Sequence, residues 1–212
     1  MNSTLDISIN KISNSRISQY DINDVPFGKC FSDHMFVAEY SDGEWNKASI
    51  MPYADVPLSY ATSALHYGQA IFEGMKAVLN AEGTPMMFRP LDNLQRLNYG
   101  ARRMALPEVP EEIFMNGLTQ LLQLDKAWIP TEAGSALYIR PFLFATDSLI
   151  VTSNPPAPSS CPGSEVVIAT WTMPTTGQGS GGPPPPYTTK ATDVSTATAA
   201  AGLTGAGAST ID

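Results

Sequence analysis

The chain is short of positive charge. Twelve Lys and Arg residues stand against 20 Asp and Glu residues, which gives a formal net charge of −8. Nucleic-acid backbones and anionic membrane surfaces are themselves negatively charged, so a chain of this charge is not expected to bind them. The composition therefore predicts no nucleic acid and no membrane as partner, and it favours a small molecule.

Cysteine and histidine are also scarce, with two residues of each among 212. Cys30 and Cys161 lie far apart and match no disulfide framework or metal-ligand spacing, which is typical of a reducing compartment. Neither His34 nor His66 stands beside the serine or cysteine and acid that a nucleophile triad requires. Hydrolase activity is therefore not expected, and the sequence predicts no metal site.

Residues 1–25 contain no long apolar run, so they match neither a secretory signal nor a membrane anchor. We expect this segment to be a flexible N-terminal extension and the protein to be cytoplasmic. Hydrophobic residues make up 43% of the whole chain, which is enough to bury a core. Folding is therefore expected.

Strand-like and helix-like segments follow one another along the rest of the chain. Period-two patterns and turn residues predict strands, which span residues 35–40, 44–50, 70–80, 85–88, 136–145 and 165–173. Apolar residues at three- and four-residue spacing predict helices at 90–107 and 110–129. The predicted fold class is α+β, a mixed sheet with flanking helices.

A Pro- and Ser-rich stretch interrupts this pattern and predicts a linker. We expect a small α/β domain at 26–150, the linker at 151–163 and the incomplete start of a second, larger domain at 164–212. Beyond Met173 the composition turns to Pro, Gly, Ala, Ser and Thr, which cannot supply half of a domain core.

Two arginines stand out as candidate ligand-binding residues. Arg96 lies beside the apolar stripe of its helix, where it could hold a phosphate or form a surface ion pair with Asp92. Arg140 lies in an apolar strand, so it needs a buried acid or an anionic ligand, and alternation places Tyr138 on the same face. If the ligands are a phosphate and a carboxylate, pyridoxal phosphate acting on an amino acid is the obvious candidate.

Four segments resemble the amino-terminal part of branched-chain amino acid aminotransferases, which are fold-type IV pyridoxal-phosphate enzymes. They occur in one consistent order over residues 26–151, as FGKCFSDHMFVAEY, ALHYGQAIFEGMKA, FRPLDNLQRLNYGARRMALP and ALYIRPFLFATDSLI. D-amino acid aminotransferases and aminodeoxychorismate lyases share that fold, but FSDHM and FEGMKA favour the branched-chain group. The resemblance implies that the first sheet and helices form the small domain of this fold.

The resemblance also implies roles for particular residues. Arg96 would grip the phosphate of pyridoxal 5'-phosphate, and an apolar aromatic pocket would discriminate branched side chains by size. The residues that would form the substrate pocket are Tyr67, Tyr138 and Arg140 on the carboxylate side and Phe27 and Phe72 on the apolar side. The implied reaction moves the amino group of Leu, Ile or Val to 2-oxoglutarate in a homodimer.

The catalytic lysine of that family, which forms a Schiff base and then acts as general base, has no counterpart in the sequence. GLTGAGAST aligns best with the family's glycine motif, and Ala208 falls where lysine is expected. Either the stretch after residue 173 is an incompletely identified part of a longer enzyme, or the chain is a catalytically silent dimerisation or ligand-binding module. An intact mass of 22.7 kDa would contradict the first interpretation.

Overall fold

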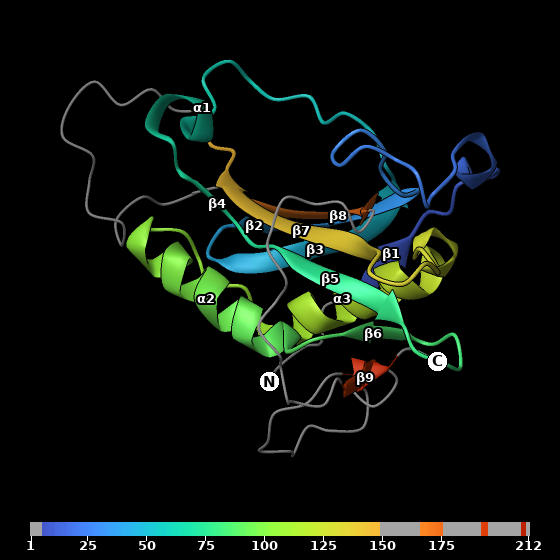
Figure 1. Cartoon of the computed structure of the whole chain (residues 1–212). Helices are drawn as coiled ribbons and strands as arrows, with labels where there is room; N and C mark the ends of the chain where they lie inside the picture. Colours follow the sequence, from blue (N-terminus) through green and yellow to red (C-terminus); the bar gives the residue numbers. More distant parts are fainter. Residues whose placement is uncertain (1–5, 149–165, 176–191, 195–208, 211–212) are drawn as a thin grey trace.

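The computed structural model describes residues 6–148, 166–175, 192–194 and 209–210 (Figure 1). The helices are α1 (Ser63–Tyr67), α2 (Pro90–Arg103) and α3 (Glu111–Leu124), with short 3-10 helices at Ile17–Gln19 and Lys126–Trp128. The strands are β1 (Ile7–Ile9), β2 (His34–Ser41), β3 (Glu44–Pro52), β4 (Ala70–Phe72), β5 (Met75–Leu79), β6 (Pro85–Met87), β7 (Ala136–Ala145), β8 (Val166–Thr175), β9 (Thr192–Val194) and β10 (Ser209–Thr210).

These strands form one mixed sheet in the order β1-β3-β2-β8-β7-β5-β6-β10-β9, and β4 pairs with β7 beside β5. β1 runs parallel to β3, whereas the pairs β3–β2, β2–β8, β8–β7 and β7–β5 are antiparallel. The β2–β3 hairpin turns at Asp42 and Gly43, whose φ angles of 55° and 88° match the positive values that tight hairpin turns need. The predicted α+β class is therefore confirmed.

Helices α2 and α3 lie together on one side of the sheet, and α1 lies near the ends of β4 and β7 (Figure 1). The predicted apolar stripes face the core, because Leu94, Leu97 and Ala101 of α2 are buried. In α3, Leu118, Leu121 and Leu122 are at most 1% exposed. The main hydrophobic core thus lies between this pair of helices and the sheet.

Gly117 shows how closely α3 approaches the sheet. A Cβ atom at this position would lie 2.5 Å from Cε1 and 2.6 Å from Cζ of the buried Phe36 ring. Alanine favours a helix over glycine by up to about 1 kcal/mol, but overpacking costs about 1–3 kcal/mol. We therefore expect Gly117→Ala to lower the free energy of unfolding by about 1–2 kcal/mol, as measured by urea denaturation.

Gly100→Ala is the matched control, because its Cβ would meet Ile71 at an ordinary contact distance of 3.4 Å. That variant should be as stable as the original chain or up to about 1 kcal/mol more stable. Equal stability of the two variants would contradict the close packing of α3 against Phe36.

Both helices end earlier than their apolar patterns predict. Helix α2 stops at Arg103 because Ala105 takes a positive φ of 56°, and Gln69 donates to the carbonyl of Met104 at 3.0 Å. Helix α3 stops at Leu124, and a 3-10 turn follows Asp125. The predicted strand 70–80 is divided into β4 and β5 by Glu73 and Gly74.

The expected flexibility of residues 1–25 is wrong for the part that the structure describes. Ile7, Ser8 and Ile9 pair in parallel with Ala48–Ile50, so β1 extends the sheet. Ile17 and Ile22 also pack against the hydrophobic core. The segment is ordered because long-range partners bind its backbone and its few apolar side chains, which local composition does not reveal.

The predicted start of a second domain at residue 164 also differs from the structure. β8 lies between β2 and β7 in the middle of the same sheet, because it pairs antiparallel with β7 along its whole length and with β2 over residues 166–171. Residues 166–175 therefore complete the first domain. The expected linker at 151–163 lies outside the described residues, as does Ala208.

Candidate functional site

Strand β7 presents two chemically different faces. Leu137, Ile139 and Leu143 are completely buried on the helix side, whereas Tyr138 and Arg140 lie on the alternate face and are only partly buried. Neither α2 nor α3 covers this second face, which we call the open face (Figure 1). The prediction that Tyr138 and Arg140 share a face is confirmed.

Arg140 is held between two aromatic rings on the open face. Its guanidinium carbon lies 4.2 Å from the ring centre of Phe72 and 5.1 Å from that of Tyr138. Its Nε is buried and has no hydrogen-bond partner among the described residues, and no carboxylate of these residues pairs with the guanidinium. Of the two expected explanations for this arginine, the buried partner acid is therefore not found in this part of the chain.

Phe27, in the loop that precedes β2, extends the same cluster. Its ring meets that of Tyr138 edge to face, with 5.3 Å between centres. Phe27 and Phe72 are 58% and 60% exposed, which is unusual for side chains of this size. Four predicted substrate-pocket residues are thus brought together over β4 and β7.

Gly74 makes room for this cluster. The registers of β4 and β5 on β7 place Gly74 opposite Arg140, and a Cβ at Gly74 would lie only 2.9 Å from Cζ of Tyr138. The absence of a side chain therefore lets the phenol ring lie flat over the strand.

Arg96 forms an ion pair on the opposite, helix-covered side. Its Nε and Nη2 atoms donate to the two carboxylate oxygens of Glu73 at 2.5 and 2.7 Å. Asn93 donates to the same carboxylate at 3.0 Å. The alternative pairing of Arg96 with Asp92 is wrong, because Asp92 pairs with Arg89 and the tertiary fold offers Arg96 a better placed, buried acid.

The charge on Glu73 is stabilised by its partners. Burial alone raises the pKa of this carboxyl, but hydrogen bonds from Arg96, Asn93 and the Gly74 amide, together with the charge of Arg96, leave the pKa below its ordinary value. The same ion pair raises the pKa of Arg96. Because the arginine is 69% exposed at its side chain while Glu73 is buried, the carboxylate fixes one edge of the guanidinium and leaves the rest accessible.

This pairing predicts a pH-dependent contribution of Glu73 to stability. A lowered folded-state pKa means that the contribution is present above the unfolded pKa of about 4.3 and is lost as the pH falls through the folded value. We expect Glu73→Gln to be less stable than the original chain at pH 7, and the difference to shrink below about pH 4. Denaturant unfolding at several pH values measures this difference in the free energy of unfolding.

Glu108→Gln is the control for that measurement, since Glu108 pairs with Arg102 at the surface with both side chains about half exposed. It should change the free energy of unfolding by less than about 1 kcal/mol. A difference for Glu73→Gln that stays constant down to pH 3 would contradict the ionised pair.

Tyr67, the fifth predicted pocket residue, lies on α1. It ends α1 and is 51% exposed, and its ring lies 6.2 Å from that of His66. Helix α1 is tied to the far end of β7 by the Ser63 amide, which donates to the carbonyl of Asp147.

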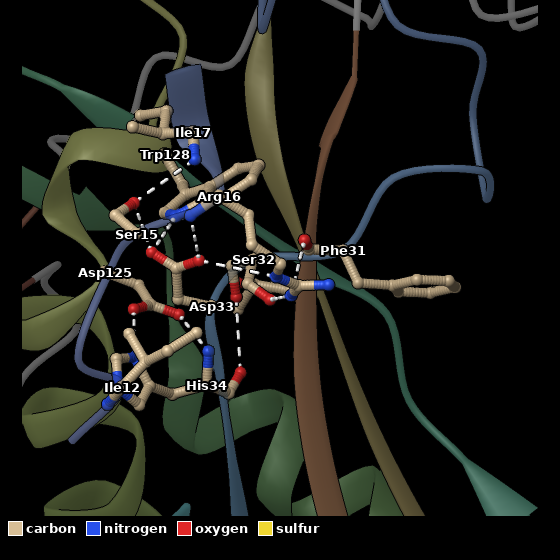
Figure 2. Close-up of polar contacts among 11 residues, drawn as sticks. Ile12, Ser15, Arg16, Ile17, Phe31, Ser32, Asp33, His34, Asp125 and Trp128 are labelled. Atoms are coloured by element: carbon tan, nitrogen blue, oxygen red, sulfur yellow. Dashed lines mark hydrogen bonds and ion pairs between the residues drawn. The ribbon is translucent and has the colours of Figure 1, made fainter. Parts of the chain in front are cut away.

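A second polar cluster, which the sequence patterns do not reveal, lies beneath the start of β2 (Figure 2). Asp33 accepts hydrogen bonds from Ser15 Oγ, the Arg16 amide and Trp128 Nε1 at 2.5, 2.9 and 3.0 Å. Burial raises the pKa of Asp33, but these hydrogen bonds and the nearby Arg16 charge outweigh it and lower the pKa overall.

His34 and Asp125 form the other half of this cluster (Figure 2). The His34 ring and amide both donate to the Asp125 carboxylate, at 2.6 and 2.9 Å. The Ile12 amide donates to Nε2 of the same ring at 2.9 Å, so Nδ1 carries the ring proton. Because both ring nitrogens are engaged and the ring is buried, His34 is a structural residue. Its partner Asp125 is 91 residues away, so no local sequence pattern reveals the pair.

Metal sites and membrane-spanning helices are not found among the described residues. No group of three or more His, Cys, Asp and Glu side chains there could hold a metal ion. Among the residues that the structure describes, no helix is both long and apolar enough to cross a membrane.

Comparison with known proteins gives close relatives in sequence. The chain is 45% identical over 128 residues to branched-chain-amino-acid transaminase 1 of Bacillus subtilis, covering 60% of this chain and 36% of that protein. It is 46% identical over 123 residues to the branched-chain-amino-acid aminotransferase of Mycolicibacterium smegmatis, covering 57% and 33%. The chain thus spans little more than a third of the length of these curated relatives. No family model matches it.

Among solved structures, a branched-chain amino acid aminotransferase from Escherichia coli is 24% identical, with a TM-score of 0.44 over 65% of this chain and 40% of that one. The relationship therefore rests on the sequence identities of 45% and 46%. Over about 60% of its length the chain is similar in sequence to branched-chain-amino-acid aminotransferases.

Proposed function

We propose that this chain provides the substrate-facing part of a pyridoxal-phosphate-dependent branched-chain-amino-acid aminotransferase. The observation that carries the proposal is Arg140, a cation between Phe72 and Tyr138 whose buried Nε has no partner among the described residues. The guanidinium as a whole is only partly buried, so a substrate carboxylate would supply its missing counter-charge in charge-assisted hydrogen bonds. The names and identities of the relatives support the reaction class.

The surroundings of Arg140 suit a small acid with an apolar side chain. Phe27 and Phe72 offer apolar surface beside the cation, and the Tyr138 hydroxyl can donate a hydrogen bond to a carboxylate. Such a wall recognises the branched chains of Leu, Ile and Val by contact and by excluding water. Tyr67 completes the carboxylate side in this proposal, from its place at the end of α1.

Arg96 suits the cofactor phosphate. A guanidinium has five N–H donors, and Glu73 engages only the edge formed by Nε and Nη2. The Nη1 end and the second Nη2 hydrogen remain able to donate to phosphate oxygens. When bound, pyridoxal 5'-phosphate supplies the electron sink for amino-group transfer. The chain's own part is to hold its phosphate and to orient the substrate carboxylate.

The finer details of the proposal follow the family resemblance. The amino-group acceptor is 2-oxoglutarate, the assembly is a homodimer, and the enzyme acts in the cytoplasm. The segment 147–151, part of which lies outside the described residues, would reach the neighbouring active site.

The test is amino transfer by the longer enzyme that the first interpretation of the stretch after residue 173 requires, purified and supplied with pyridoxal 5'-phosphate, leucine and 2-oxoglutarate. The proposal predicts equal amounts of glutamate and the 2-oxo acid of leucine, and a cofactor absorbance that borohydride changes irreversibly. Ala208 at the position expected for lysine favours the second candidate, a silent binding module. Cofactor and substrate binding without any product would support that module and contradict the enzyme.

A further inference from the structure

The chain closes a loop by joining residues 15–16 to residues 31–33 (Figure 2). Asp33 accepts from Ser15 Oγ and the Arg16 amide, and Arg16 Nη2 donates in return to the carbonyls of Ser32 and Phe31 at 2.5 and 3.4 Å. We call these contacts the Asp33 clip. The clip brings together the two ends of the loop 17–32, in the manner of a compact Ω-loop.

The loop is built so that one aromatic side chain projects from it. Val25 and Cys30 are buried in the core at 7% and 3% exposure, on either side of a turn in which the Lys29 amide donates to the Pro26 carbonyl. Gly28 has a φ of 76°, and a type II turn requires such a positive value at its third position. Phe27, between the two anchors, is pushed outward and meets Tyr138.

We propose that Asp33 is a positioning residue: through the clip it holds the loop 17–32 closed and thereby fixes Phe27 against Tyr138 on the substrate side of the site. This inference rests on the proposed function for the role of the open face, but the positioning itself is a property of the chain alone. Asp33 touches neither ring and acts only through the loop.

The chemistry of the clip explains why a carboxylate is needed. The Arg16 amide and Trp128 Nε1 can donate hydrogen bonds but cannot accept them, and they donate to different carboxylate oxygens of Asp33. Asparagine has nearly the same shape, but its amide group would face one of these two N–H groups. Asp33→Asn therefore breaks the clip without creating a cavity. Trp128 also contacts Tyr20 of the loop, with 5.9 Å between ring centres.

The experiment compares Asp33→Asn with the original chain in three measurements. These are the nuclear Overhauser effect between the Phe27 and Tyr138 ring protons, amide exchange within the loop, and affinity for the 2-oxo acid of leucine. We expect Asp33→Asn to lose the Overhauser effect and to speed exchange of the Lys29 amide by about tenfold or more. The affinity should fall by about threefold to tenfold, since only one wall of the site is released.

Asn98→Ala is the matched control, because Asn98 also bridges two chain segments, through the amide and carbonyl of Val109, but lies away from this loop. It should leave the Phe27–Tyr138 effect and the affinity unchanged. If Asp33→Asn does not fold, Ser15→Ala replaces it, with a severalfold faster exchange expected in residues 17–32 alone.

Retention of the Overhauser effect in a folded Asp33→Asn variant would overturn the inference. So would an equal increase of exchange throughout the sheet, because Asp33 would then only stabilise the fold. If the original chain does not bind the 2-oxo acid, the proposed function fails, and the Overhauser effect still decides whether the clip positions Phe27.

Discussion

Replacing Arg140 with alanine is expected to raise the dissociation constant for the 2-oxo acid of leucine by about 10- to 100-fold, because a hydrogen bond to a charged group contributes about 1.5–3 kcal/mol. The guanidinium is the cation held by Phe72 and Tyr138 on the open face, and its buried Nε has no other acceptor among the described residues. Titration calorimetry of the purified chain measures the constant.

The matched control is Arg102→Ala, which removes an arginine that pairs with Glu108 on the surface of the molecule. It should leave the dissociation constant unchanged within about twofold. Arg140→Lys keeps the charge but loses the planar fork, so its affinity should lie between those of the original chain and the alanine variant. An equal loss in the Arg102 and Arg140 variants would show that Arg140 has no specific role in binding.

Replacing Asp125 with alanine is expected to lower the free energy of unfolding by about 2–5 kcal/mol, since each buried donor left without an acceptor costs about 1–3 kcal/mol. The His34 amide and ring would both lose their partner, and both residues are almost completely buried. His34 would then hold the Ile12 amide less firmly, so the attachment of the amino-terminal segment should weaken as well. Urea denaturation measures the change in stability.

Asp92→Ala is the control for the Asp125 variant, because Asp92 pairs with Arg89 at a site where both side chains are about half exposed. Its effect should be below about 1 kcal/mol. A similar small effect of Asp125→Ala would mean that His34 finds another acceptor and that the buried pair is not required.

The sequence predicts the elements well where the pattern is local. The strand 136–145 has the same bounds in the structure, because burial alternates from Leu137 to Leu143 within the strand itself. Tyr138 and Arg140 follow from the same rule. The helix ends are less accurate, since α2 and α3 stop where Ala105 and Asp125 meet groups distant in sequence rather than at a recognisable stop signal.

The partners of charged side chains could not be predicted in the same way. Asp92 is the local candidate for Arg96, but the partner is Glu73, a buried residue between β4 and β5 that lies 23 residues away and is also held by Asn93. The contact of Asp33 with Trp128 spans 95 residues. Such pairs depend on the tertiary fold, and for the same reason the order of residues 7–9 is invisible in their composition.

One short segment of the chain links the two faces of the sheet. Phe72 and Gly74 belong to the open face with Arg140, whereas Glu73 between them turns to the helix side and holds Arg96. Neighbouring residues thus contribute to the proposed substrate wall and to the proposed phosphate-binding arginine. This arrangement explains why a three-residue stretch can serve both functions without a change in strand register.

The proposed function requires that the open face binds a branched-chain acid. An NMR titration of the unchanged chain with the 2-oxo acid of leucine tests this directly. We predict saturable shifts in the signals of Phe27, Phe72, Tyr138 and Arg140, while Trp45 at the distant β2–β3 hairpin stays unchanged. A titration without saturable shifts at these four residues would contradict the proposed substrate site.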